Sequence, residues 1–549
     1  MAEASLGLAI FSIGLTIAGL SQSTETVSSY GIISSFHPLY YVGFGVLMLA
    51  FVIEFATTSR LRVLTLEMLL AESYLWIIPV FWLPGLVFPA AYHDLFFYPY
   101  IASIVSTGHI NPPVYIYQGF PAPYFLTAIA EEVLSPLRYI SVARLAPFII
   151  NVVVSLFVYV FLRSQLGMQR AKYGILGVMF FELFNFTEQF TTLTPFTAGF
   201  LFYYCAIFVM LSLVIKNRNI QSGKIVSLFA LLLVALSISQ PIIGLLALSG
   251  IFGAMVYISK LKGTPNSYMF SILFLFGVMV VAWAVFQTYF ISSYFTVISS
   301  SFANLFNGLF GATATRYATT SAAHREVVDS KLAILGIIGI IAVPSLIRSI
   351  LNRSWRTNLL FSVLGGIAVA SVLVGGLQST NFNAYLLAAI LPIFILFDLL
   401  TLQSLGRRLS FVSLAVILIA SAPLSYAALY GNVASESPTS PTLFASVYYS
   451  IFSPVNPSNR LSLVGLGLGY FGPVLSSLVP FTLEPNIPNE SYFLGPHTQF
   501  VALGGDAYLQ IGTEYGNETV VSDAMANLQS SPGWISVYSS QNVELFSQT

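Results

Sequence analysis

The sequence predicts an all-α polytopic membrane protein with about thirteen transmembrane helices and a small α/β-like extracytoplasmic tail at the C-terminus. Hydrophobic residues make up 56% of the chain and charged residues only 8%, whereas a soluble domain carries about 25% charged residues. Apolar runs of roughly 17–25 residues, the length that crosses a bilayer, recur as far as residue 430. No long hydrophobic segment follows in the tail.

The predicted spans follow one another along the first four fifths of the chain. The first has the length of a signal peptide, but Glu3 stands where a basic n-region is expected, so we predict a retained span. Only Ser239, Gln240 and Pro241 separate the seventh from the eighth, which form either two helices or one kinked helix. The expected ranges are 5–20, 38–58, 63–90, 138–162, 172–187, 197–215, 224–239, 241–258, 267–297, 331–350, 358–377, 383–402 and 409–430.

Basic residues divide the links between these spans into two sets, and the positive-inside rule puts the richer set in the cytoplasm. We therefore predict a protein of the cytoplasmic membrane with its N-terminus inside and its tail outside. The richer set holds Arg60, Arg62, Arg163, Arg170, Lys172, Lys216, Arg218, Lys224, Lys260, Lys262, Arg348, Arg353, Arg356, Arg407 and Arg408. The other side holds only Arg138, Arg144, Arg316, Arg325, Lys331 and Arg460.

This topology predicts three regions. Residues 1–62 form an additional N-terminal transmembrane hairpin, and residues 63–430 form the transmembrane core. Residues 431–549 form an extracytoplasmic domain, and its last part has a strand–helix–strand pattern over 519–540. The core carries two large outside loops, 91–137 and 298–330. The zero formal net charge provides no field that would attract nucleic acid. The single cysteine, Cys205, excludes an intrachain disulfide and a thiolate metal cluster.

The 91–137 loop is the first place to search for chemistry, because it interrupts the spans with acidic, aromatic and proline-rich sequence. Leu95–Thr107 is predicted to be a short helix that Gly108 ends. The prolines that follow exclude regular helix, since they remove donors and fix φ. Tyr124–Leu134 has the apolar spacing of a helix that lies in the membrane interface, with Glu131 and Glu132 toward water.

Asp94 follows an apolar span directly, and an ionisable residue at a membrane boundary is a candidate functional group. It has two interpretations that do not exclude each other: a general base or ligand at the mouth of a cavity, and the N-cap of the helix that follows. His93, Asp94 and His109 match no standard zinc spacing, so no tightly held metal is predicted. A loosely held divalent ion, Mg or Mn, between Asp94 and a substrate phosphate is compatible with the sequence.

Other polar residues have a functional and an ordinary interpretation. Outside arginines either hold a phosphate bidentately or extend to lipid headgroups. Glu188 is either a second acidic wall of the cavity or a solvated interfacial residue, and for Glu182 an inter-helix hydrogen bond is favoured. Glu54 and Glu72 lie inside spans, where acids serve as proton or cation relays in transporters, whereas Glu67 and Asp398 fall near cytoplasmic ends. The arginines concerned are Arg138, Arg144, Arg316 and Arg325.

The chain resembles the GT-C superfamily of polytopic glycosyltransferases that use lipid-phosphate sugars. The residues that carry the resemblance are His93-Asp94 at the outer end of a span, then a helix, Thr107-Gly108-His109-Ile110 and Tyr117-Gln118-Gly119-Phe120-Pro121. The resemblance implies that Asp94 occupies the position of the catalytic acid or base. It also implies transfer of a sugar from a polyprenyl-phosphate carrier to an extracytoplasmic glycan, lipid or protein acceptor. The WWDYG motif of oligosaccharyltransferases is absent, and histidine replaces the first acid of the usual acidic pair.

Two other functions stay open at this point. A transporter or flippase for a lipid-linked or small polar substrate would use Glu54, Glu72 and Asp398, although broken helices and symmetric halves are not evident in the sequence. A non-catalytic subunit of a membrane or surface assembly fits the tail and the degenerate motif. For the glycosyltransferase, the predicted substrate contacts are His93, His109, Tyr117, Arg138, Arg144, Glu188, Arg316 and Arg325. The predicted partners are membrane lipids, the carrier-linked sugar and the acceptor, with no nucleic acid and no nucleotide.

Overall fold

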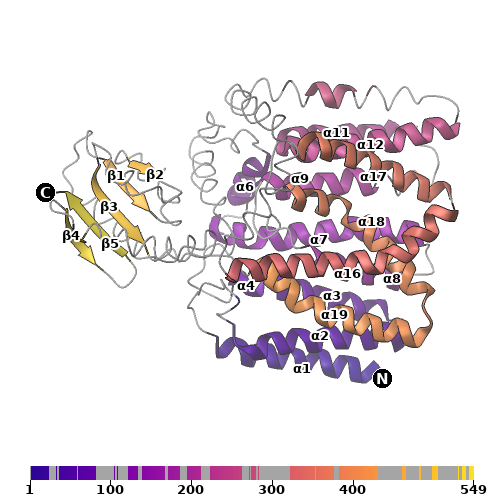
Figure 1. The fold of residues 1–549 in the computed structure, drawn as a ribbon, viewed down its shortest axis with the longest axis horizontal. Coiled ribbons are helices and arrows are strands. Elements are labelled where there is room, and N and C mark those ends of the chain that lie inside the picture. Colours follow the sequence, from indigo (N-terminus) through magenta and orange to yellow (C-terminus); the bar gives the residue numbers. More distant parts are fainter. Residues whose placement is uncertain are drawn as a thin grey trace.

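The computed structural model shows a bundle of roughly aligned helices and a separate β-sheet (Figure 1). The N-terminus and the turn between the last two helices lie at one end of the bundle, and the sheet lies beyond the opposite end (Figure 1). Apart from short pieces, the structure describes residues 2–23, 36–57, 60–81, 104, 108, 122–133, 139–166, 171–185, 195–209, 223–262, 322–352, 354–375, 382–430 and the strands between 460 and 548.

Every predicted span overlaps helical residues, although of the span at 267–297 only short pieces belong to the described residues, among them the helical stretch 274–279. The helices are α1 Ala2–Ser21, α2 Pro38–Thr57, α3 Leu61–Trp76, α4 Ile78–Phe81, α6 Ala122–Val133, α7 Tyr139–Leu166, α8 Ala171–Phe184, α9 Pro195–Tyr204 with the π-helical turn η5 Cys205–Val209, α11 Gly223–Ser239, α12 Pro241–Lys262, α16 Ala322–Asn352, α17 Trp355–Gly375, α18 Phe382–Ser404 and α19 Arg407–Tyr430.

Seven of the described helices are long and apolar enough to cross a membrane, which supports a membrane location. They lie in α1, α2, α7, α12, α16, α18 and α19. Shorter apolar helices occupy Phe196–Phe208 and Trp355–Ala370. The number thirteen stays a prediction.

The third predicted span, 63–90, is not one continuous helix in its described part. Helix α3 ends at Trp76 and α4 begins at Ile78. The cause is Pro79, which has no N–H to bond the carbonyl of Leu75 one turn earlier. The Tyr430 hydroxyl of α19 donates to that Leu75 carbonyl instead. The break is thus stabilised by a side chain of α19, the last helix along the chain.

The seventh and eighth predicted spans are two helices, α11 and α12, with only Gln240 between them. Pro241 is the first residue of α12, a position where the missing N–H has no helical partner to lose. The backbone N–H of Gln240 still bonds the Leu236 carbonyl at 3.1 Å, so α11 keeps its last turn.

The first two helices pack closely along their length. A Cβ at Gly19 would lie 2.5 Å from the main-chain nitrogen of Tyr40, so the two helices touch main chain to main chain there. The Ser12 hydroxyl of α1 donates to the Gly43 carbonyl of α2 at 2.7 Å. Small and hydroxyl residues therefore join α1 to α2, as is common between membrane helices.

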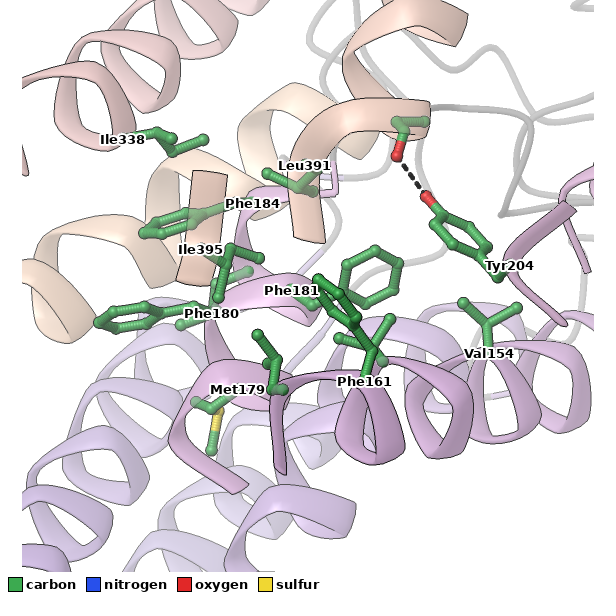
Figure 2. Close-up of a cluster of buried hydrophobic side chains, with 14 of the residues drawn as sticks. Val154, Phe161, Met179, Phe180, Phe181, Phe184, Tyr204, Ile338, Leu391 and Ile395 are labelled. Atoms are coloured by element: carbon green, nitrogen blue, oxygen red, sulfur yellow. Dashed lines mark hydrogen bonds between the residues drawn. The ribbon is translucent and has the colours of Figure 1, made fainter. Parts of the chain in front are cut away.

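The core around α8 is aromatic (Figure 2). Phe180, Phe181 and Phe184 of α8 are fully buried. Figure 2 shows them among side chains of α7, α9, α16 and α18, with the Tyr204 hydroxyl of α9 directed at a main-chain carbonyl of α18. That carbonyl belongs to Ala388. It lies four residues before Pro392, which cannot bond it, so a tyrosine again satisfies a carbonyl that a proline leaves free.

The tail contains a five-stranded sheet with strand order β2-β1-β3-β5-β4. Strand β1 pairs in parallel with β2 and β3, whereas β5 pairs antiparallel with β3 and β4. Within the predicted strand–helix–strand pattern over 519–540, β4 is the final strand, and 519–528 lie outside the described residues. The strands are β1 Arg460–Val464, β2 Phe481–Leu483, β3 Thr498–Gly504, β4 Trp534–Ser539 and β5 Val543–Gln548. The extracytoplasmic domain at 431–549 stays a prediction, as do the boundaries at 62 and 430.

Candidate functional site

Most of the predicted site residues lie outside the part of the chain that the structure describes. These are His93, Asp94, His109, Tyr117, Arg138, Glu188 and Arg316. Arg144 lies on α7, where the main chain alone is described. Arg325 lies near the start of α16 with its side chain exposed. Glu326 and Asp329 are exposed beside it, so this stretch of α16 has a solvated face.

Gly108 has the conformation that the sequence predicts for the residue after a helix. Its φ is +72°, in the left-handed region that favours glycine. Its N–H bonds the Ile104 carbonyl at 2.8 Å, and Ile104 itself is helical and buried. This is the single bond of the αL type of helix C-cap. Gly108 therefore has the conformation expected at the end of a helix, whereas residues 95–103 and 105–107 of the predicted helix lie outside the described residues.

Helix α6, Ala122–Val133, occupies the second helix predicted in this loop. One face is buried, with Tyr124 and Thr127 turned toward the bundle. The opposite face exposes a stripe of large apolar side chains: Phe125, Leu126, Ile129 and Val133. Glu132 is exposed as well. This arrangement fits a helix that lies in the membrane interface with an apolar stripe toward lipid.

A buried polar junction joins α3, α7 and α8. Glu182 of α8 is 1% exposed, and each of its carboxylate oxygens accepts a hydrogen bond from another helix. The indole N–H of Trp76, at the end of α3, donates to Oε2 at 2.6 Å. The hydroxyl of Ser155 on α7 donates to Oε1. The inter-helix hydrogen bonding favoured for Glu182 is therefore confirmed, with one bond to α3 and one to α7.

Glu72 of α3 lies one helical turn before Trp76 and is completely buried. Neither of its carboxyl oxygens has a hydrogen-bond partner within the described residues. Helix α3, which carries it, packs against α7 and α8, the helices of Ser155 and Glu182. Burying a carboxylate without a partner is costly, so this group needs a chemical explanation.

The other acids flagged in the spans are buried too. Glu54, Glu67 and Asp398 are each 1% exposed or less. Glu54 accepts a 2.6 Å hydrogen bond from the Ser5 hydroxyl of α1. Asp398 lies in the last third of α18, and neither of its oxygens has a partner in the described part of the chain. Taken with Glu72 and Glu182, five acidic side chains and no basic one are buried among the described residues.

Two members of the buried junction carried no functional signal in the sequence. A serine inside a span, such as Ser155, is common and has no distinguishing neighbour. Trp76 stands near the end of a predicted span, where tryptophan ordinarily marks the membrane interface. The signal that would have found Trp76 is Pro79, three residues beyond α3, which predicts that the helix ends near Trp76.

Comparison with known proteins gives structural likeness without sequence likeness. No protein-family model matches the chain, and no curated protein matches its sequence. The apo oligosaccharyltransferase of Archaeoglobus fulgidus superposes with a TM-score of 0.54 at 13% identity, over 85% of this chain and 73% of that one. The AglB oligosaccharyltransferase of the same organism, in complex with an inhibitory peptide and a dolichol-phosphate, gives 0.53 at 14% identity, over 84% and 72%. ArnT from Cupriavidus metallidurans gives 0.47 at 12% identity, over 89% and 98%, a score too low to establish a shared fold.

The chain therefore shares its fold with the archaeal oligosaccharyltransferase, which agrees with the resemblance found in the sequence. At 12–14% identity this likeness concerns the fold alone. The absence of the WWDYG motif of oligosaccharyltransferases is compatible with the shared fold, because proteins of one fold can differ in their functional motifs.

Proposed function

We propose that the chain is a membrane glycosyltransferase that moves a sugar from a polyprenyl-phosphate carrier to an extracytoplasmic acceptor. The observation that carries the proposal is the likeness to the archaeal oligosaccharyltransferase over more than four fifths of this chain. One of those structures holds a dolichol-phosphate, and another is tethered to an acceptor peptide. The carrier and acceptor classes of the proposal follow from these neighbours.

In this proposal Asp94 orients or deprotonates the acceptor hydroxyl. The outside arginines Arg138, Arg144, Arg316 and Arg325 supply charge that stabilises the departing carrier phosphate. His93, His109, Tyr117 and Glu188 contribute the remaining polar contacts to the sugar and acceptor. The C-cap geometry of Gly108 supports this arrangement, because the sequence predicts a helix that begins beside Asp94 and ends there.

A weakly held divalent cation, Mg or Mn, belongs to the same proposal. One neighbour structure contains Zn and sulfate. In this chain the expected donors His93, Asp94 and His109 lie outside the described residues, and the described part contains no group of three or more metal-ligating side chains. Such an ion would neutralise phosphate charge beside Asp94.

The proposed orientation places the tail and the 91–137 loop outside the cytoplasmic membrane. The sheet lies at the end of the bundle opposite the N-terminus (Figure 1), which supports this orientation. Single-cysteine variants in a Cys205→Ala background test it. An impermeant thiol reagent applied to intact cells should label Ser440→Cys and should not label Arg407→Cys. The reverse pattern would overturn the orientation and, with it, the assignment of the site.

Asp94→Asn tests the catalytic role. Asparagine keeps a side-chain oxygen that caps a helix, so a capping role alone predicts nearly unchanged folding and turnover. Loss of a general base predicts a rate lower by about 10²–10⁴-fold. The measurement is glycosyl transfer from a polyprenyl-phosphate sugar by purified Asp94→Asn protein of matched thermal stability, with Asp94→Ala as the variant that loses both functions. Wild-type turnover in Asp94→Asn would show that Asp94 is a cap and not the general base, whereas no glycosyl transfer by the wild-type protein would favour the transporter or assembly-subunit alternative.

A further inference from the structure

The helix pair α12–α17 ends in two basic side chains at the membrane boundary. Lys260 of α12 is the last residue of the apolar span Ile243–Lys260. Arg356 is the second residue of α17, whose apolar stretch begins at Trp355. Both basic side chains are exposed. The two charges therefore stand where the apolar part of each helix ends, which is the depth of lipid headgroups.

Glycines hold the main chains of α12 and α17 in contact and define their register. A Cβ on Gly366 of α17 would lie 3.4 Å from the Cα atom of Gly250 on α12. A Cβ on Gly253 of α12 would lie 2.0 Å from the carbonyl oxygen of Ser362 on α17. A later residue of α12 thus pairs with an earlier residue of α17, so the two helices are antiparallel and pack closely toward the end that carries the charges.

This register puts the two basic residues at the same level. Lys260 lies ten residues after Gly250, and Arg356 lies ten residues before Gly366. At a rise of about 1.5 Å per residue, each is about 15 Å along its helix from the same glycine pair. Both side chains are long, so their charged groups can meet at one anion. The glycine contact itself has no room for a ligand, and the pair of charges lies beyond it.

No carboxylate of the two helices neutralises this basic pair. Neither α12 nor α17 contains an aspartate or a glutamate. Of the described helices that pack against them, α9, η5 and α11 contain none, and α18 contributes only Asp398, which is completely buried. The neighbouring sequences 263–270 and 353–354 contain no acid either. The pair therefore attracts an anion from its surroundings.

An exposed apolar stripe leads from Lys260 along one face of α12. Val256 and Phe252 lie one and two turns before Lys260 on the same face, and each side chain is 49% exposed. Helices α12 and α17 lie on the opposite side of the bundle from α1 and α2 (Figure 1). A ligand with a negative group and a hydrocarbon chain fits both the basic pair and the stripe, whereas a soluble anion would use the basic pair alone.

Trp355 restricts the arginine of the pair. The guanidinium carbon of Arg356 lies 5.7 Å from the centre of the Trp355 ring, which is a cation–π contact. Tryptophan is enriched at the membrane–water interface, and this ring is half-buried at the start of α17. A guanidinium that already rests on a ring loses less freedom when an anion binds, so the contact favours binding.

We propose that Lys260 and Arg356 form a binding site for the phosphate of an anionic phospholipid, whose acyl chain lies along Val256 and Phe252. The phosphate oxygens accept hydrogen bonds from the Lys260 ammonium and the Arg356 guanidinium. A zwitterionic phospholipid brings a positive group to the same pair and binds more weakly. The site is separate from the proposed glycosyl transfer and does not depend on it.

The test titrates the purified, delipidated full chain in detergent with phosphatidylglycerol or phosphatidylcholine, with bound lipids counted by native mass spectrometry. The wild-type protein should bind phosphatidylglycerol more tightly. A basic residue near a membrane surface strengthens binding to anionic lipid about fivefold, so Lys260→Gln with Arg356→Gln should weaken phosphatidylglycerol binding by about 30-fold. Binding of phosphatidylcholine should not change. Both side chains are exposed, so the double variant should unfold at the wild-type temperature, and Lys260→Arg should bind like wild type.

Arg60→Gln with Arg62→Gln is the matched control, because it removes two exposed arginines at the start of α3. It should keep the tightest phosphatidylglycerol site. An equal loss in this control would show that overall positive charge attracts the lipid, and it would overturn the site. Displacement of the lipid by glycerol 3-phosphate at the same concentration would assign the basic pair to a soluble phosphate, and tighter binding of a polyprenyl phosphate would assign it to the carrier. Either result would overturn the proposal and leave the test of glycosyl transfer unaffected.

Discussion

The contact between α12 and α17 and the junction of α3, α7 and α8 join helices in opposite ways. In the first, a Cβ on Gly253 would lie 2.0 Å from the Ser362 carbonyl oxygen, and a Cβ on Gly366 would lie 2.0 Å from the Ser249 carbonyl oxygen. The two main chains touch, and the reciprocal pairing shows that the helices are antiparallel. In the second, a carboxylate, an indole and a hydroxyl bridge three helices.

The difference separates a contact made by main chains from one made by polar side chains. At α12–α17 the glycines leave no room for another group, so the contact has one arrangement and no capacity to bind. At α3–α7–α8 polar side chains meet, and the Glu72 carboxyl group is buried without a hydrogen-bond partner in the described residues. The polar junction also ends at Trp76, from which the chain leads through α4 to the loop that carries Asp94.

The largest effect is expected from enlarging the glycine contact. In Gly253→Leu the new side chain meets the main chain of α17, which cannot move aside without separating the helices. Overpacking of this kind costs about 3 kcal/mol. Equilibrium unfolding in mixed detergent micelles would measure the loss. A variant as stable as wild type would show that α12 and α17 do not touch at these glycines.

The polar junction is expected to respond next most strongly. Trp76→Phe keeps an aromatic six-membered ring but removes the N–H that donates to Glu182, which leaves Oε2 without that donor. Loss of a hydrogen bond to a charged group costs about 1.5–3 kcal/mol. The same substitution in a Glu182→Gln background should cost less, because the charge is gone, and this double-mutant cycle isolates the bond. Equal costs in both backgrounds would contradict the bond.

These two contacts also show what the sequence could and could not predict. Hydrophobic run length located the helices well, because crossing a bilayer requires apolar segments of a set length. It could not predict that α3 ends at Trp76, since residues on both sides of Pro79 are equally apolar. A glycine in a span indicates close packing but does not name its partner, so the pairing of Gly253 with Ser362 needed the structure.

In the candidate site, too, some features could be predicted from the sequence and others could not. The helix end at Gly108 was predictable because glycine alone adopts a positive φ without strain, and the prolines that follow exclude more helix. The hydrogen bond of Glu182 was the favoured interpretation, yet its donors Trp76 and Ser155 lie 106 and 27 residues away in sequence. No spacing rule connects residues on three separate helices. The roles of Asp94 and the outside arginines stay predictions.

A smaller effect is expected where tyrosines satisfy carbonyls that prolines leave free. Tyr430→Phe removes the hydroxyl that donates to the Leu75 carbonyl, and one neutral hydrogen bond contributes about 1 kcal/mol. Tyr426→Phe, one turn earlier on α19, is the matched control, since the Tyr426 hydroxyl has no hydrogen-bond partner in the described part of the chain. It should be neutral or stabilising. A larger loss in Tyr426→Phe than in Tyr430→Phe would reverse this assignment.

The smallest effect is expected at Gly365, and it sharpens the comparison because Gly366 is its neighbour on α17. A Cβ at Gly365 meets nothing within 4 Å, and this residue is exposed. Gly365→Ala should therefore leave the free energy of unfolding unchanged or raise it by about 0.5–1 kcal/mol, because alanine is the better helix former and nothing obstructs its methyl group. Gly366→Ala places the same methyl group against the Ser249 carbonyl and should be clearly destabilising. Both variants add one methyl group to adjacent positions of one helix, so any difference in their unfolding measures the main-chain contact with α12 and not helix propensity. Equal stabilities would mean that α12 and α17 can separate at no cost, and the contact would then be no more fixed than the polar junction.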